Sequence, residues 1–401
     1  MVATGAFSYV AFFVAARGMS STDASTFVSW WAIVNTGVLA LTIPLDTYAP
    51  RMRLDCERLE IPDVDRRRLI GSYALTVGVG FLVVVLCLAL FRIIHISTYE
   101  SIGVGMFGVS VAVTGGLRAN LVAESRFTRF LFLSVVSSVV GATLLFVSFV
   151  NRPVSITEAF LVASTGGFVG WLMTKRWGAD GSVEALGNRE ALRRLESTSP
   201  VAVLRRLSAS TLVALMLSNG AVILGRFVGV TNENLIVYAA AVNIVLIPFM
   251  LLNTLTAPIH NRVVGLLREG KPELIRTLYR RSMITYLAIV TAMASLSLAG
   301  LPLLVRLYIG DEYSLGAKES FFICMGEGLA TVIALPRVFI VALGRTKRLT
   351  RVWAAGLIAF LLTMFTPVSV LTRMIAAPVV ASVIILVLTQ VGLRWNSRGP
   401  E

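Results

Sequence analysis

Apolar runs long enough to cross a bilayer recur along the whole chain. A membrane-spanning helix needs about 20 mostly apolar residues, and twelve stretches of roughly this length alternate with shorter polar segments. The first six begin near Val2, Thr26, Leu69, Glu100, Phe130 and Ile156, and the second six begin near Ser208, Leu235, Met283, Ser320, Leu349 and Met374. The pattern predicts an all-α integral membrane protein with about 12 transmembrane helices.

The second half of the chain repeats the first half. When residue 100 is placed on residue 319, nine of 30 positions are identical without a gap, and Arg118 then falls on Arg337. An earlier register places Asn35 on Asn243. We therefore expect two pseudo-symmetric six-helix lobes, residues 1–173 and 208–401, joined by a cytoplasmic linker at 174–207. Parallel repeats of this kind are typical of alternating-access transporters, which bind substrate between the repeats.

The basic residues indicate how the helices are oriented. The chain is 56% apolar and only 14% charged, yet its net charge is +14. Of the 36 lysines and arginines, 27 fall in loops on one side of the predicted membrane and seven on the other. Cytoplasmic loops carry such an excess, so both termini are predicted to be cytoplasmic. The positive charge is thus explained by membrane topology, and we expect no nucleic-acid partner.

Few residues suit metal binding or catalysis. The three cysteines and two histidines are scattered, with no paired spacing, at Cys56, Cys87, Cys324, His95 and His260. This excludes a disulfide framework and predicts neither a metal site nor a cofactor. No nucleotide-binding loop or nucleophile elbow occurs, so we do not expect an enzyme. The first apolar run lacks the basic start of a signal peptide and is expected to be a retained transmembrane helix.

Four arginines lie within or beside the apolar runs. Arg118 and Arg337 are near the cytoplasmic ends of the fourth and tenth spans, and Arg17 and Arg226 are toward the outer ends of the first and seventh. A charge at the bilayer centre costs about 2.5–3.5 kcal/mol, so these side chains either face a wet interior or extend to lipid phosphates. If all four face inward, they form a cationic cavity suited to a phosphate or pyrophosphate group.

Glu327 is an acidic residue inside an apolar run. It lies about a third of the way into the predicted membrane from the outside, and glycine occupies the equivalent position in the first repeat. Intramembrane carboxylates often bind protons or cations. We expect Glu327 either to couple transport to an ion or to serve as a structural partner for an arginine or a backbone group.

Other polar and small residues in the spans have two interpretations each. Asn35 and Asn243 are mid-span, where an amide can bind sugar hydroxyls or form hydrogen bonds between helices. Gly166 and Gly170 form a pair of small residues four apart, a spacing typical of close helix packing.

The segment from Gly5 to Leu41, GAFSYVAFFVAARGMSSTDASTFVSWWAIVNTGVLAL, resembles the opening of the Wzx-type bacterial polysaccharide flippases. In that family, part of the MOP superfamily that also contains the MATE exporters, a first helix ends in an arginine and a short turn leads to a second helix. The resemblance covers the architecture throughout, while its motifs are concentrated in spans 1–2 and 7–8. It implies two six-helix lobes around a cationic central cavity, with Arg17 and Arg226 at the matching positions.

The resemblance also implies a function. These flippases move a polyprenyl-pyrophosphate-linked oligosaccharide from the inner to the outer leaflet of the bacterial cytoplasmic membrane. The expected partners are the lipid-linked glycan, membrane lipids, and glycan polymerases or glycosyltransferases.

Other classes of membrane protein remain open at this point. A MATE-like drug exporter shares the architecture but favours acidic residues in its cavity. A major facilitator transporter has a short Gly-Asp/Arg loop after its second helix, whereas this loop is long. A glycan polymerase needs a large outer loop carrying carboxylates, and every predicted outer loop here is short. A non-transporting scaffold of a glycan-assembly complex is the fourth alternative.

Overall fold

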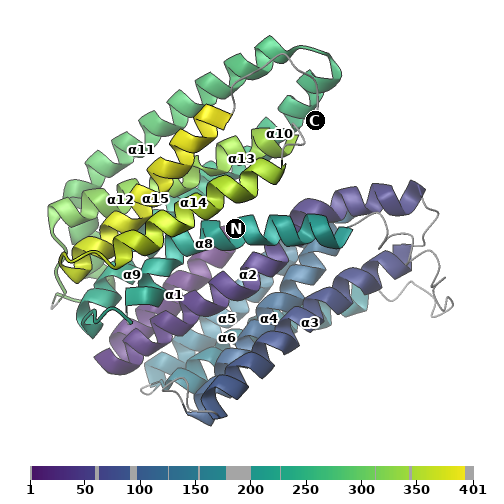
Figure 1. Cartoon of the computed structure of the whole chain (residues 1–401). Coiled ribbons are helices and arrows are strands. Elements are labelled where there is room, and N and C mark those ends of the chain that lie inside the picture. The colour runs from purple at the N-terminus through teal and green to yellow at the C-terminus, as the bar shows by residue number, and fades with distance from the viewer. Residues whose placement is uncertain are drawn as a thin grey trace. The chain divides into compact units, whose positions relative to one another are not determined.

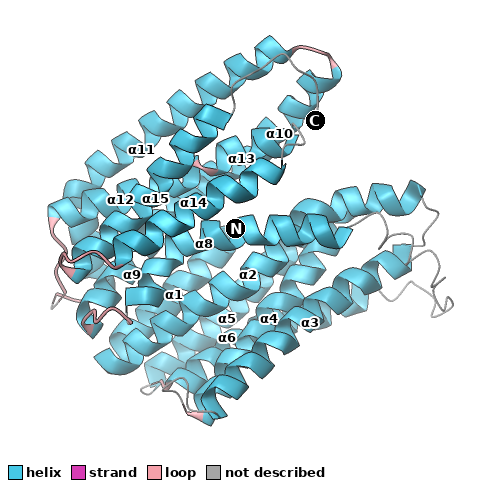
Figure 2. Cartoon of the chain, viewed as in Figure 1, coloured by secondary structure: helices cyan, strands magenta, loops and turns pink. Residues whose placement is uncertain are grey.

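The computed structural model describes residues 2–58, 63–90, 97–124, 126–151, 154–177, 200–225, 227–311, 313–342 and 346–392. Across these ranges the regular secondary structure is entirely helical, as Figure 2 shows. The first seven helices are α1 (Val2–Gly18), α2 (Ser21–Arg58), α3 (Asp63–Leu90), α4 (Thr98–Ala123), α5 (Phe127–Asn151), α6 (Ile156–Trp177) and α8 (Pro200–Gly225). They are followed by α9 (Asn232–Thr254), α10 (Thr256–Arg268), α11 (Pro272–Ile309), α12 (Ala317–Val332), α13 (Ala334–Ala342), α14 (Thr346–Met364) and α15 (Val370–Gly392).

These helices confirm the predicted fold class. Within the described ranges, eight helical segments are long and apolar enough to cross a membrane, and three shorter apolar helices lie at 135–150, 156–172 and 351–364. Every predicted span coincides with a helix or a pair of consecutive helices (Figure 1). The chain is therefore a multi-pass, all-α membrane protein.

The chain divides into two compact units, Ala3–Leu212 and Val213–Glu401, with the boundary inside α8. Most of the predicted linker at 174–207 lies outside the described ranges. In the N-terminal unit, α4 packs against α2, α3 and α6, and α5 packs against α6. In the C-terminal unit, α12 packs against α9, α11 and α15, and α14 packs against α15. The central helices, α4 and α12, are the two that carry the strongest sequence repeat.

Aromatic rings fill the interior of the N-terminal unit where α2, α4 and α6 meet. The Trp31 ring stacks on Phe107 with centroids 4.7 Å apart, and the Phe27 and Phe160 centroids are 4.8 Å apart. All four side chains are buried. Aromatic pairs at these separations add about 0.5–1.5 kcal/mol beyond the area they bury, so they help to fix the three helices together.

Close helix packing at Gly166 and Gly170 is confirmed. A Cβ atom added to Gly166 would collide with the backbone oxygen of Ser137 on α5, and one added to Gly170 would lie 2.7 Å from Leu133. The absence of side chains at these two positions allows α5 and α6 to approach each other closely.

Two helices of the C-terminal unit end shortly before a proline. The eighth span ends with α9, and α10 begins the basic segment that follows it, whereas the tenth span consists of α12 and α13. Helix α9 ends at Thr254, four residues before Pro258, and α12 ends at Val332, four residues before Pro336. A proline lacks the N–H group that would bond to the carbonyl four residues earlier, so each helix ends at that carbonyl. The segments after the breaks, α10 and α13, pack against each other.

Helices α2 and α11 are longer than the predicted spans. Each has 38 residues, which corresponds to about 57 Å of helix, whereas the hydrocarbon core is about 30 Å thick. The arginine-rich segments next to them, expected as loops, therefore include helical turns. The same holds for Arg66 and Arg67, which lie in the first turns of α3 and not in a loop.

Candidate functional site

Glu327 lies in the interior of the C-terminal unit, in the second half of α12. Only 2% of the residue is exposed. A Cβ atom added to the preceding Gly326 would lie 3.3 Å from Val379 of α15, and one added to Gly328 would collide with Val290 of α11. The two glycines thus allow the neighbouring helices to close around the carboxylate on both sides.

The polar surroundings of Glu327 are sparse. The Ser218 side chain of α8 and Tyr238 of α9 both lie close enough to interact with the carboxyl group. Tyr238 uses its own hydroxyl to donate to the Met374 carbonyl oxygen at 3.3 Å. The Oε2 atom of Glu327 is buried and forms no hydrogen bond in the described part of the chain.

This arrangement limits what Glu327 can do. Within the described residues no ion pair joins Glu327 to an arginine, and Arg226 lies outside those residues, so the role of Glu327 as an arginine partner stays a prediction. Those residues also contain no group of three or more metal-ligating side chains. One buried carboxyl with an unpartnered oxygen can hold a proton or a weakly bound monovalent cation, since a buried charge must be neutralised or paired.

The four arginines predicted to bind a pyrophosphate group are only partly described. Arg17 is exposed in the last turn of α1, with its guanidinium 5.5 Å from the centre of the Phe13 ring. Arg118 lies in the second half of α4 and Arg337 in α13, both half-buried. Arg226 falls outside the described residues. Because successive helices reverse direction, Arg17 and Arg118 lie toward opposite ends of the N-terminal unit and are not brought together.

Asn35 and Asn243 form the same hydrogen bond in both repeats. The Nδ2 atom of Asn35 donates to the Trp31 carbonyl oxygen at 3.0 Å, and that of Asn243 donates to the Ala239 carbonyl oxygen at 3.0 Å. Each bond connects a side chain to the preceding turn of its own helix, so these amide hydrogens do not join two helices. The shared geometry extends the sequence repeat to the level of side-chain contacts.

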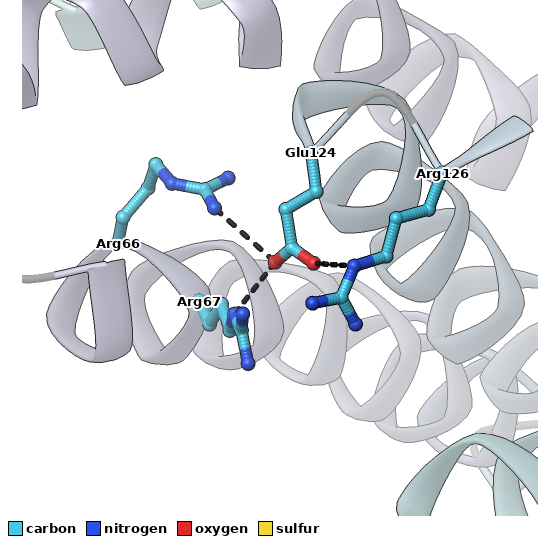
Figure 3. A network of polar contacts seen from close by, with 4 residues as sticks. All are labelled: Arg66, Arg67, Glu124 and Arg126. Carbon is cyan, nitrogen blue, oxygen red and sulfur yellow. Dashed lines mark hydrogen bonds and ion pairs between the residues drawn. The ribbon is translucent and has the colours of Figure 1, made fainter. Parts of the chain in front are cut away.

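A group of four charged residues in the N-terminal unit escaped the sequence prediction (Figure 3). The Glu124 carboxylate, just past the end of α4, lies 2.6 Å from Arg67 Nε, 3.3 Å from Arg66 Nη2 and 3.1 Å from Arg126 Nε. The Arg66 side chain is fully buried. We call these four residues the Glu124 cluster. Because the sequence placed its arginines in solvated loops, only the fold reveals that one carboxylate holds them together.

Comparisons with known proteins connect this architecture to one class of structure. No protein-family model and no curated protein matches the sequence. An inward-facing multidrug resistance MATE family transporter of the MOP superfamily superposes with a TM-score of 0.76 at 12% identity, covering 98% of this chain and 96% of that one. The fold is that of the MATE transporters.

Two further solved structures agree with this fold. The eukaryotic MATE transporter AtDTX14 gives a TM-score of 0.63 at 13% identity and covers 99% of this chain and 94% of its own. A MOP superfamily transporter from Pyrococcus furiosus, described as having a binding pocket of reverse polarity that suggests a different function, gives a TM-score of 0.62 at 13% identity. It covers 96% of this chain and 95% of its own.

Proposed function

We propose that this protein is a membrane exporter working by alternating access, and that its substrate is a polyprenyl-pyrophosphate-linked oligosaccharide. The observation that carries the exporter part of this proposal is the likeness of the fold to MATE transporters, which extends over 98% of the chain. In this mechanism the substrate moves from the inner to the outer leaflet of a bacterial cytoplasmic membrane. The arginine distribution supports cytoplasmic termini.

Cationic side chains favour a lipid-linked pyrophosphate over a cationic drug. Arg17, Arg226, Arg118 and Arg337 are the proposed pyrophosphate-binding residues, because guanidinium groups form paired hydrogen bonds with phosphate oxygens. Not all four need to act in one state, since Arg17 and Arg118 lie at opposite ends of their unit and can serve successive stages of translocation. The Pyrococcus furiosus transporter supports this assignment, because its reported pocket shows that the fold is not restricted to one polarity.

The remaining proposed roles concern the sugar and the driving force. Asn35 and Asn243 keep half-buried amides that we assign to sugar hydroxyls. Glu327 supplies ion coupling, since its unpartnered oxygen can take up a proton or a cation. Glycan polymerases or glycosyltransferases that make or use the same lipid-linked glycan are the proposed partners.

A MATE-like exporter of small molecules is the second candidate. The buried Glu327 favours it as much as it favours a flippase, because ion-driven export of either substrate requires a group that binds the ion. The two candidates differ in the substrate that the arginines must hold.

Leaflet exchange in proteoliposomes tests the proposal. A fluorescent polyprenyl-pyrophosphate-linked oligosaccharide is incorporated with the purified protein, and its exchange is followed by chemical quenching from outside. We expect exchange by the wild type and its loss in Arg17→Ala and Arg226→Ala. Arg306→Ala is the matched control, because Arg306 is exposed in the last turn of α11 and is not a proposed ligand.

Each outcome of this assay decides between the candidates. Exchange that persists at the wild-type rate in both arginine variants contradicts the pyrophosphate site. No exchange by the folded wild type contradicts the flippase. If the same liposomes then export a small organic cation, the small-molecule exporter replaces the flippase as the proposed function. If they transport neither substrate, the non-transporting scaffold replaces both.

A further inference from the structure

A partly open pocket of about 290 Å³ lies at the surface of the N-terminal unit between α3, α4 and α6, with Leu75 and Trp171 exposed at its edge. Its lining includes Gly71 and Leu75 of α3, Val113 and Asn120 of α4, and Trp171 of α6. Asn120 supplies the one side-chain amide, and the other lining residues are glycine, aliphatic or aromatic. The volume is close to the lower limit of about 300 Å³ for small-molecule pockets, and the walls suit a hydrocarbon chain.

Asn120 is incompletely satisfied in this cavity. Its Oδ1 atom is buried and accepts no hydrogen bond from the described protein groups. Asn120 as a whole is only half-buried, so the Nδ2 end of its amide can donate to an oxygen acceptor of a ligand in the pocket.

The cavity and the Glu124 cluster occupy the same faces of the same helices. Arg67 is four residues before Gly71 on α3, and Glu124 is four residues after Asn120 on α4. Residues four apart lie on one helix face, about 6 Å apart along the axis. The cluster therefore lies one helical turn beyond the amide end of the cavity, at the side that the arginine distribution assigns to the cytoplasm.

The cluster has cationic groups available to a ligand. Three guanidinium groups contact one carboxylate (Figure 3). The side chains of Arg67 and Arg126 remain 35% and 42% exposed, and both contact Glu124 through Nε. In each guanidinium one terminal amino group lies on the edge away from Nε, so it can donate to an anion that approaches from the membrane surface.

We propose that this site binds an anionic phospholipid of the inner leaflet. Arg67 and Arg126 hold the phosphate, Asn120 donates to an ester carbonyl of the glycerol backbone, and part of one acyl chain enters the cavity beside Trp171. The spacing agrees with the dimensions of a bilayer, because the headgroup layer on each side is about 5–8 Å thick, similar to one helical turn. The charge of the cluster selects an anionic lipid over a zwitterionic one.

Tryptophan quenching by brominated lipids tests this site. The full-length protein in detergent is titrated with phosphatidylglycerol or phosphatidylcholine carrying bromine on the acyl chains, and Trp171→Phe defines the contribution of Trp171. We expect saturable quenching of Trp171 by phosphatidylglycerol, with at least roughly fivefold weaker binding of phosphatidylcholine, from the attraction of one arginine to an anionic lipid.

Two substitutions of glycine on α3 make a matched pair. A Cβ atom added to Gly71 or to Gly80 would meet no atom within 4 Å, so both positions accept a larger side chain. Gly71→Leu places its side chain in the cavity and is expected to abolish saturable quenching, whereas Gly80→Leu retains it. Arg67→Gln is expected to weaken phosphatidylglycerol binding about fivefold while leaving phosphatidylcholine binding unchanged.

The outcomes separate a defined site from general lipid contact. Equal quenching by the two lipids, or quenching that Gly71→Leu leaves unchanged in a protein with wild-type melting behaviour, overturns the proposal. If Arg67→Gln lowers the melting temperature, that variant is set aside. Gly71→Leu then tests whether the acyl chain enters the cavity, and the comparison of the two lipids on the wild type tests the selectivity for an anionic headgroup.

Discussion

Replacing Glu327 by glutamine tests whether its carboxyl group takes up an ion. The side chain is 2% exposed and its Oε2 atom has no hydrogen bond in the described part of the chain. An ionised side chain costs up to about 2.5–3.5 kcal/mol at the bilayer centre, and a carboxylate buried inside the membrane at any depth is unfavourable, so the folded state favours a carboxyl neutralised by a proton or a cation. Glutamine has nearly the same shape and is neutral at every pH, so it mimics the neutral state permanently.

The structure gives different magnitudes for the two roles of Glu327. If the carboxyl is neutral in the fold, Glu327→Gln preserves the packing and the contact with Ser218, and the free energy of unfolding changes by less than about 2 kcal/mol, the scale of one altered hydrogen bond. If the carboxylate is charged and paired, removing it costs about 3–5 kcal/mol. We expect the smaller change.

Transport is measured on the same variant. Proteoliposomes containing the labelled glycan lipid receive an imposed proton or sodium gradient, and the stimulation of translocation by the gradient is compared with the rate without it. We expect Glu327→Gln to lose the stimulation and to keep exchange without a gradient. Glu319→Gln makes the same chemical change in the first turn of α12, where the side chain is half-exposed, and is expected to respond like the wild type.

Two results would refute this reasoning. Wild-type stimulation in Glu327→Gln shows that the carboxyl carries no coupling ion. A loss of 3 kcal/mol or more, about the cost of a broken buried ion pair, shows that the carboxylate is charged and structural.

Three further substitutions test the packing and the charges. Gly166→Ala forces a Cβ atom against the Ser137 backbone and should lower the free energy of unfolding by about 1–3 kcal/mol, whereas Gly80→Ala, in open space, should not lower it. Glu124→Gln removes the shared partner of three arginines and should cost about 3 kcal/mol or more in the same denaturation measurement. Ser97→Ala removes the capping box of α4 and should lower the free energy of unfolding by about 1 kcal/mol. A wild-type free energy of unfolding in any of these three variants would contradict the mechanism given for it.

The number and order of the spans could be predicted from hydrophobicity alone, since a lipid-facing helix must be apolar over the thickness of the bilayer. The close approach at Gly166 followed from the spacing of small residues. The Glu124 cluster could not be predicted, because Arg66 and Glu124 are 58 residues apart and only the packing of α3 on α4 brings them together. The surroundings of Glu327 escaped prediction for the same reason, as they come from α8, α9, α11 and α15.

The central helices of the two predicted repeats, α4 and α12, carry different chemistry. In α4, Gly108 occupies the position of Glu327, and a Cβ atom there would collide with the Phe81 ring, so the N-terminal unit has no room for a carboxylate. Leu117 occupies the position of Pro336, and α4 continues through it without a break. In α12 the buried carboxyl lies less than two turns before the break that the proline causes.

Neutralising Glu327 therefore changes the charge of a helix that is already interrupted, whereas α4 is continuous and tightly packed. A change in charge at Glu327 can be relieved by adjusting the α12–α13 junction, because the bond that would hold the junction straight is missing. If Glu327 couples transport to an ion as proposed, the difference between the repeats places both the ion-binding carboxyl and the interrupted helix in the C-terminal unit.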